Sequence, residues 1–301
     1  MPTPPLIVEL KPNSLDDGPG IRSVVFFKGC ALSCEWCHNP ESGDARAELA
    51  FDASACVGAG PCFAACEERA LDPARPERVD RARCTRCFRC VEACPSGALR
   101  VVGRALTQVD ILRMVDRYLP FYRTSGGGLT VSGGEPTLHL DYLGELLAAV
   151  KARGVHTLLE TCGTFDLDRY SAVVAPHVDQ VYFDLKLLDD DAHRRHCGAS
   201  NARILANFRA LQARALAGGT PVLPRIALIP GRTATTENLT AAARFLRECG
   251  ATRVAVLDYN PLWHAKAAQL GLAARFERRT WLSAEERAAA RACFDGFEVV
   301  S

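Results

Sequence analysis

The chain has 301 residues, of which 48% are apolar and 24% are charged, and its formal net charge is +1. This length and composition suit one large packed domain, alone or with a small module. The balanced charge gives no reason to expect nucleic acid or an anionic membrane as a partner. No signal peptide and no apolar run of roughly 18 residues is evident, so we expect a cytoplasmic protein.

The beginning of the chain predicts two strands joined by a turn. Residues 6–10 are strand-like, residues 16–20 combine Asp, Gly and Pro as turns do, and residues 23–27 are β-rich. A group of cysteines follows the second strand at once. The sequence therefore predicts that these cysteines lie on a loop at the end of a strand.

Cys30, Cys34 and Cys37 place three thiolates within eight residues of that loop. Such a set can bind three irons of a cubane [4Fe–4S] cluster and leave the fourth iron open, as a catalytic metal requires. The alternative is a structural zinc site completed by His38 or by a remote residue. Zinc sites usually come as paired two-ligand knuckles, which this loop lacks.

Residues 53–102 are rich in Cys, Pro, Arg and Ala and lack long apolar periods, so they predict a module that needs metal to fold. The chain has 14 cysteines, and ten of them lie between Cys30 and Cys94. In a reducing compartment such clustering indicates metal binding. The bacterial ferredoxin spacing C-x2-C-x2-C-x3-C-P occurs without deviation at Cys84, Cys87, Cys90, Cys94 and Pro95.

A second run repeats this register, with Ala59 in place of its second cysteine and Glu67 in place of the proline. In two-run ferredoxins the fourth cysteine of each run binds the other cluster. One cluster should therefore be complete, with the ligands Cys66, Cys84, Cys87 and Cys90. The other cluster has only Cys56, Cys62 and Cys94. The sequence leaves open whether it is a [3Fe–4S] cluster, a cubane with a non-cysteine ligand or a degraded site.

From about residue 104 onward, strands and helices alternate. The expected strands are 129–132, 156–161, 180–185, 223–229 and 252–258, and the expected helices are 108–119, 140–151, 167–174, 201–216 and 236–249. With residues 23–27 this makes six units, which predict a parallel sheet with right-handed crossovers. A helix at 282–295 and a last strand at 297–300 complete the chain.

We therefore expect an α/β fold: a partial (β/α)6 TIM-like barrel with an inserted bacterial ferredoxin-like α+β module. The barrel comprises residues 1–52 and 103–301, and the module comprises residues 53–102. An open doubly wound sheet fits the same pattern.

Several expected strands end in polar or glycine-rich groups. The strand 129–132 leads into Gly133, Gly134 and Glu135, where glycines let the backbone approach a ligand closely. Other strand ends carry Glu160 with Thr161, Asp184 with Lys186, residues 229–231, and Asp258 with Asn260. Ligand sites of α/β sheets lie at these ends, so their shared position predicts a site.

The remaining candidates have simpler interpretations. Cys162 follows Thr161 and is within reach of the site, but a lone buried thiol is usually inert packing. We interpret the other scattered cysteines, Cys197, Cys249 and Cys293, in the same way. His38 either hydrogen-bonds a cluster sulfur or faces water, His264 is a candidate site residue near Asn260, and residues 277–288 read as a solvated helical face.

With these residues in hand, the chain resembles the radical SAM enzymes. The loop of Cys30, Cys34, Trp36 and Cys37 and the Gly-Gly-Glu-Pro run at 133–136 are the two main signatures of that superfamily. More closely, it resembles the activating enzymes of glycyl radical enzymes, among them the pyruvate formate-lyase activase, in its runs 14–22, 37–40, 122–128 and 184–186. The insertion at 53–102 is typical of the members with extra clusters. The resemblance covers about residues 6–266.

The resemblance implies a role for each matching residue. The catalytic [4Fe–4S] cluster would be bound by Cys30, Cys34 and Cys37, and its open iron by the amino and carboxylate groups of S-adenosylmethionine. The residues expected to bind that cofactor are Trp36, Ser132, Gly133, Gly134, Glu135, Glu160, Asp184, Lys186 and Asn260, with Lys186 also counted as catalytic. The family often has Asp in place of Glu160 and His in place of Asn260, which makes the role of Asn260 doubtful.

The implied activity is reductive cleavage of S-adenosylmethionine to a 5′-deoxyadenosyl radical, which abstracts hydrogen from a glycine of a partner glycyl radical enzyme. We expect an oxidoreductase that works anaerobically with a low-potential donor such as flavodoxin or ferredoxin. Residues 53–102 would relay electrons or help to dock the partner. Three alternatives stay open: a radical SAM enzyme acting on a small molecule or another target, an electron carrier, and a zinc-stabilised binding protein.

Overall fold

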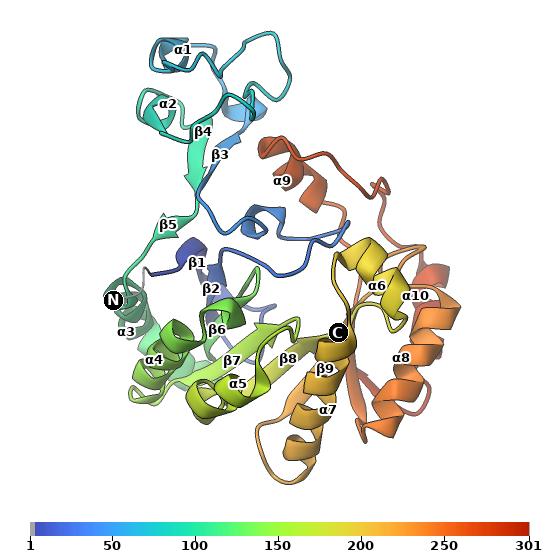
Figure 1. Cartoon of the computed structure of the whole chain (residues 1–301). Coiled ribbons are helices and arrows are strands. Elements are labelled where there is room, and N and C mark those ends of the chain that lie inside the picture. Colours follow the sequence, from blue (N-terminus) through green and yellow to red (C-terminus); the bar gives the residue numbers. More distant parts are fainter. Residues whose placement is uncertain (1–3, 301) are drawn as a thin grey trace.

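The structure, a computed structural model, describes residues 4–300 of the chain. Its main body is a nine-stranded sheet in which six neighbouring strands are parallel and follow one another in chain order (Figure 1). These strands are β2 (Arg22–Phe27), β6 (Gly128–Gly133), β7 (His156–Thr161), β8 (Gln180–Asp184), β9 (Val222–Ala227) and β10 (Arg253–Leu257). All six strands predicted from the sequence are present, with small shifts at their ends.

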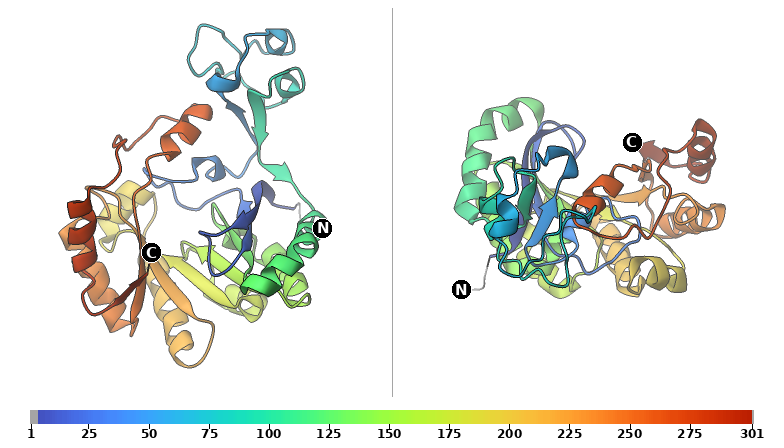
Figure 2. Two further views of the ribbon diagram at one scale, coloured as in Figure 1. Left: turned by 180° about the vertical axis from the view of Figure 1, so that it is seen from behind. Right: turned by 90° about the horizontal axis from the view of Figure 1, so that it is seen from above.

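The two edges of the sheet differ. Beside β10 lies β11 (Glu298–Val300), again parallel, and beside β2 lie β1 (Leu6–Ser14) and β5 (Arg104–Ala105), both in antiparallel pairing. The strands β11 and β5 end the strand order on opposite sides. The sheet is therefore an open, curved α/β sheet, and Figure 2 shows its helices on the outside, consistent with a partial barrel.

The predicted helices α3 (Gln108–Ser125), α4 (Leu140–Lys151), α5 (Leu167–Val173), α7 (Ala202–Leu216) and α8 (Thr236–Glu248) connect the parallel strands. Near the C-terminus, α10 (Ala284–Ala292) is shorter than predicted. The helices α6 (Asp190–Cys197) and α9 (Trp263–Gln269) were not predicted. Short 3-10 helices are η1 (Pro40–Ser42), η2 (Ala53–Ala55), η3 (Pro136–His139) and η4 (Ala175–His177). Across residues 4–300, no helix is both long and apolar enough to cross a membrane.

The cysteine-rich segment forms a unit that stands away from the barrel in Figure 1. Its strands β3 (Glu48–Phe51) and β4 (Leu99–Val102) pair with each other, and between them lie the one-turn helices α1 (Pro61–Ala64) and α2 (Arg89–Glu92). A small core of its own is built from Leu49, Phe51, Leu71, Val79, Cys90, Ala98 and Leu99. Because β3 pairs with β4, this unit begins before the predicted boundary at residue 53.

The runs 14–22 and 122–128 meet at the end of the barrel where β2 and β6 begin. Tyr122 donates a hydrogen bond from its hydroxyl to Ser23 Oγ at 2.6 Å, and the backbone N–H of Gly128 donates to Ile21 O at 3.2 Å. A Cβ on Gly127 would lie 1.8 Å from Ile21 O, so only glycine fits there. These two runs therefore lock the first two barrel strands together.

A buried ion pair connects the barrel to the cysteine-rich unit. Lys28 directly follows β2, and its Nζ donates to Glu48 Oε2 at 2.6 Å and to Glu41 O at 2.7 Å. The side chain of Lys28 has no exposed surface, and that of Glu48 is 13% exposed. Breaking such a pair leaves an uncompensated buried charge, which destabilises a protein strongly.

We expect Lys28→Met to lower the free energy of unfolding by about 3–5 kcal/mol, because it leaves Glu48 and Glu41 O without their donor. Urea unfolding of the reconstituted protein measures this loss. The matched control is Lys11→Met, which removes the half-exposed pair with Asp17 and should cost less than about 1 kcal/mol. Equal losses in the free energy of unfolding for the two substitutions would contradict a stabilising role of the buried Lys28–Glu48 pair.

Candidate active site

The carboxyl ends of the parallel strands surround one cavity of about 820 Å³. Parallel pairing places these ends at one edge of the sheet, so residues far apart in the sequence meet there. The predicted site residues that line the cavity are Cys30, Cys34, Trp36, Cys37, Ser132, Gly133, Gly134, Glu160, Asp184 and Lys186. The structure therefore brings these predicted residues together around one cavity.

The cysteine loop after β2 is fixed by the end of helix α6. Backbone N–H groups of Ser33 and Glu35 donate to Cys197 O at 2.8 Å and to His196 O at 3.1 Å. The Glu35 carboxylate lies 3.0 Å from both Arg232 Nε and His196 Nδ1. Burial alone would raise the pKa of Glu35, but these two partners hold it below its ordinary value. The loop is thus held in place by contacts that the sequence did not reveal.

The thiols of this loop are partly buried, and burial raises the pKa of Cys37 to about 12. Two of the scattered cysteines lie against the loop, Cys162 beside Cys30 and Cys197 beside Cys34. They are therefore neighbours of the site as well as packing residues. Metal binding here would require the thiols to lose their protons.

Within the described part of the chain, no three His, Cys, Asp or Glu side chains converge on the position of a single metal ion. A cubane cluster needs a wider arrangement, because each thiolate binds a different iron. Three thiols on one loop at the wall of a large cavity fit that arrangement.

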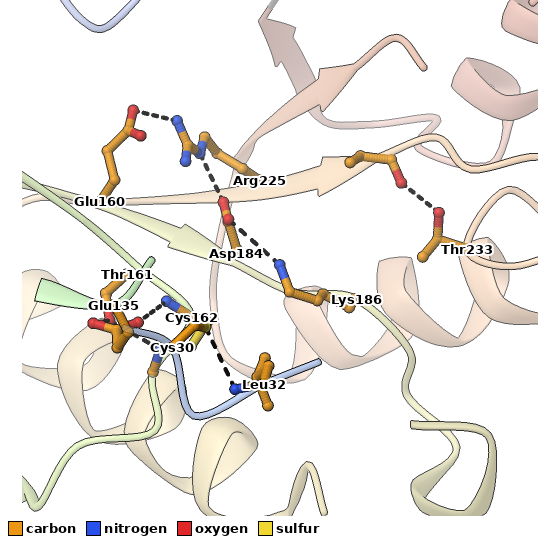
Figure 3. A network of polar contacts seen from close by, with 12 residues as sticks. Cys30, Leu32, Glu135, Glu160, Thr161, Cys162, Asp184, Lys186, Arg225 and Thr233 are labelled. Atoms are coloured by element: carbon orange, nitrogen blue, oxygen red, sulfur yellow. Dashed lines mark hydrogen bonds and ion pairs between the residues drawn. The ribbon is translucent and has the colours of Figure 1, made fainter. Parts of the chain in front are cut away.

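Figure 3 shows a chain of charges along the opposite wall of the cavity. Arg225 lies between two acids, with its guanidinium 2.5 Å from Glu160 Oε1 and 2.9 Å from Asp184 Oδ1. Asp184 also faces Lys186 Nζ at 3.5 Å, and Ser132 Oγ donates to Glu160 Oε2 at 2.6 Å. Arg225 was not among the predicted site residues, although a single charge inside an apolar strand was a usable signal.

This network keeps Asp184, Lys186 and Arg225 charged. Burial alone would raise the pKa of Asp184, but Arg225 and Lys186 hold it below its ordinary value. Conversely, burial would lower the pKa values of Lys186 and Arg225, but their acidic neighbours raise both. The cavity therefore offers fixed positive and negative groups side by side, which suits a zwitterionic ligand.

Glu135 was predicted to bind the cofactor, but its carboxylate has other partners. It is fully buried, and Oε1 accepts hydrogen bonds from Thr137 and from Thr161 Oγ1, the latter at 2.9 Å. Its Oε2 accepts from the backbone N–H of Cys162 at 2.7 Å. Because Glu135 is fully buried and is not among the cavity-lining residues, its carboxylate positions the ends of β6 and β7.

Asn260 and His264 also differ from expectation. Asn260 Oδ1 accepts from the backbone N–H of Leu262 at 2.9 Å, so it stabilises a turn and is not among the cavity-lining residues. His264 is buried, stacks on Trp263, and lies 3.0 Å from Arg278 O. The sequence placed both near the site because they follow β10, but the chain turns away from the cavity there.

His38 lines the cavity and is mostly buried. Burial lowers its pKa to about 4, with Lys186 adding to the effect, so the imidazole is neutral at physiological pH. Among the described residues, its buried Nε2 has no hydrogen-bond partner. This nitrogen lies beside the cysteine loop and is available to hydrogen-bond a cluster sulfur, which is one of the two roles expected from the sequence.

In the module, the structure gathers the cysteines into the two predicted sets. Cys66, Cys84, Cys87 and Cys90 line one small cavity. A second small cavity is lined by Cys56, Cys62, Cys94 and Ala59. Cys84 also lines the large cavity, so the first set adjoins the active-site region.

The C-terminal segment holds the cysteine loop and the module together. Arg275 donates to Ser33 O, and Lys266 Nζ lies 2.6 Å from Glu41 Oε1. Gln269 accepts from Arg81 at its backbone and from Arg100 at its side chain. These contacts give a structural role to residues 263–276.

A family model described as the radical SAM superfamily matches residues 24–246. The chain is 39% identical to the isethionate sulfite-lyase activating enzyme of Desulfovibrio desulfuricans, over 88% of this chain and 86% of that protein. It is 38% identical to the benzylsuccinate synthase activating enzyme of Thauera aromatica, over 91% of this chain and 84% of that protein. It is 31% identical to the pyruvate formate-lyase 2-activating enzyme of Escherichia coli, over 88% of this chain and 80% of that protein.

Among solved structures, the fold is similar to that of Streptococcus suis SuiB bound to precursor peptide SuiA, with a TM-score of 0.52 and 14% identity. The match covers 90% of this chain and 46% of SuiB. At this identity the likeness concerns the fold alone.

We expect Arg225→Met to lower the unfolding temperature by about 5 °C or more at pH 8, because it removes the cation between Glu160 and Asp184 and leaves Asp184 with Lys186 alone. The deficit should narrow at pH 5. Without Arg225 the pKa of Asp184 is raised and its carboxyl takes up a proton more readily, whereas in the wild type Arg225 and Lys186 hold that pKa below its ordinary value. Differential scanning calorimetry at both pH values checks this. Arg194→Met, at an exposed pair with Asp190, is the control, and a deficit independent of pH would contradict the prediction.

Proposed function

The chain belongs to the radical SAM superfamily and, within it, to the activating enzymes of glycyl radical enzymes, and we propose that its cavity is where S-adenosylmethionine is cleaved. The observation that carries the proposal is the meeting of the Cys30–Cys37 loop with the Glu160–Arg225–Asp184–Lys186 network in one cavity. The family implies a [4Fe–4S] cluster and S-adenosylmethionine. When bound, they supply one-electron cleavage of the sulfonium to methionine and a 5′-deoxyadenosyl radical, which takes a hydrogen atom from a glycine of the partner enzyme.

In this proposal the protein binds and orients the reactants. Cys30, Cys34 and Cys37 hold the cluster as thiolates. The backbone polar groups of Gly133 and Gly134 approach the methionyl amino group, because a glycine turn lets a ligand come close. Holding reactants in a fixed geometry can be worth about 7–11 kcal/mol of the barrier.

The charged wall positions the rest of the cofactor. Asp184 and Glu160 accept hydrogen bonds from the ribose, and Lys186 pairs with the methionyl carboxylate. Arg225 holds the two acids in place and helps to keep Asp184 ionised. Trp36 is buried at the cavity wall, where it would pack against the adenine. The buried walls exclude water from the reacting groups.

We further propose that residues 53–102 are a ferredoxin-like insertion with two clusters, which passes electrons from a flavodoxin or ferredoxin to the catalytic cluster. The gathering of seven cysteines around two small cavities supports this proposal. Cys84 belongs to the complete set and also lines the large cavity. In this proposal the complete cluster is therefore the one that passes electrons to the catalytic cluster.

Anaerobically purified protein with dithionite and S-adenosylmethionine should release 5′-deoxyadenosine, measured by liquid chromatography. Cys34→Ala should abolish the release, because the catalytic cluster then lacks a ligand. With a glycyl radical enzyme added, the wild type should also produce a protein radical detected by electron paramagnetic resonance. Zinc in place of iron, or iron without cleavage, would leave a metal-folded binding protein or an electron carrier. Cleavage without a radical on any such partner would favour a different target.

Cys84→Ala tests the relay. It should remove one module cluster, about four irons per chain. With reduced flavodoxin as donor, release of 5′-deoxyadenosine should fall at least about tenfold, since the path to the catalytic cluster is broken. With dithionite, which reduces the catalytic cluster directly, the rate should stay near that of the wild type. If Cys84→Ala releases 5′-deoxyadenosine at the same rate with flavodoxin as with dithionite, the relay role is contradicted. The module would then serve to dock the partner enzyme.

A further inference from the structure

The two cysteine runs of the module share one backbone conformation. In the complete run, Arg86 and Phe88 have φ values of 60° and 61°, in the left-handed region that non-glycine residues rarely adopt. At the same places in the incomplete run, Gly58 and Gly60 have φ values of 70° and 90°. A one-turn helix follows in each case, α1 and α2. The incomplete loop therefore keeps the path that surrounds a cluster in the complete one.

Ala59 occupies the place of Cys87 in this shared path. Both residues are exposed, so this corner of each loop faces solvent. A Cβ added to Gly58 or Gly60 would meet no atom within 4 Å, so the chain leaves open space beside Ala59. A methyl group cannot bind iron, so Ala59 supplies no ligand at the corner that Cys87 takes in the complete set.

A positive charge adjoins this incomplete site. The Arg78 guanidinium lies over the rings of Phe51 and Phe63, at 5.2 and 5.5 Å from their centroids, and its NH2 group is 3.9 Å from Cys56 Sγ. Its Nε is buried and has no partner within the protein. A guanidinium so placed favours negative charge in the cavity that it lines.

We propose that Cys56, Cys62 and Cys94 hold a cubane [4Fe–4S] cluster whose fourth iron has no protein ligand, faces solvent beside Ala59 and binds an exchangeable small anion. The preserved loop path argues for four irons, because the backbone still surrounds the fourth corner. The open space beside Ala59 argues for an exogenous ligand, and Arg78 argues for an anionic one. This inference rests on the iron–sulfur assignment of the module proposed above.

The experiment uses full-length protein in which Cys30, Cys34 and Cys37 are all replaced by alanine, so that the catalytic cluster cannot respond. After anaerobic reconstitution we expect about eight irons per chain, from two cubanes. Titration of the reduced protein with cyanide, a small anionic iron ligand, should shift one of its electron paramagnetic resonance signals. Ala59→Cys should abolish the shift and retain the iron, because a thiolate then closes the corner.

Two variants make the test independent of that substitution. Cys87 is exposed whereas Cys84 is partly buried, so an external ligand can replace the thiolate of Cys87, and Cys87→Ala should open the other cubane and double the amount of cyanide bound. Arg78→Met should weaken cyanide binding about tenfold, because a neighbouring positive charge is lost. Its control, Arg113→Met, removes an equal charge from the exposed face of α3 and should leave binding unchanged.

About seven irons, with the signal of an oxidised trinuclear cluster and no response to cyanide, would overturn the proposal. So would about four irons, which would mean a degraded site, or a cyanide shift that persists in Ala59→Cys. Failure of the proposed function is separate. It would appear in the unmodified protein as absence of 5′-deoxyadenosine, whatever the module binds.

Discussion

The parallel pairing of β2 with β6 extends to Phe27 opposite Gly133, and the geometry of the site depends on it. Because the two strands end together, the cysteine loop after β2 and the glycine turn after β6 start from adjacent points. Backbone hydrogen bonds from Gly134 to Phe27 O and from Glu135 to Gly29 O continue the contact beyond the strands. A Cβ on Gly134 would lie 2.1 Å from Gly29 O, so this approach requires glycine. The Gly-Gly signature is therefore a packing requirement as much as a ligand-binding one.

The charged wall places acidic side chains inside the protein, where burial opposes their ionisation. Glu160 comes from β7, Asp184 from β8 and Arg225 from β9, so three neighbouring strands each supply one member. A buried carboxylate without a partner would take up a proton, which would change what it can bind. For Asp184, Arg225 and Lys186 counter that tendency. The charge of the cavity wall thus depends on Arg225 whether or not that residue contacts a ligand.

The sequence predicted the barrel strands well, because buried parallel strands read as short apolar runs between helical periods. It also predicted which cysteines gather together, since the ferredoxin register specifies them. It failed where a residue's role depends on a partner distant in the sequence. Nothing near Cys197 or Arg225 in the sequence indicates the loop or the acids that they contact, and the hydrogen bonds of Glu135 to Thr161 and Cys162 cross to the next strand. Helix α6 was missed because it is short and highly charged.

The cysteine-rich unit leaves the barrel and returns to it through one antiparallel strand pair, with Glu48 opposite Val102. Its two connections to the barrel are therefore neighbours in space, as at sites where proteins tolerate inserted domains. The crossover from β2 to β6 retains its own helix, α3, without that unit. The cysteine-rich unit can accordingly be shortened, exchanged or lost in evolution while the barrel stays intact, so that the two parts can diversify separately.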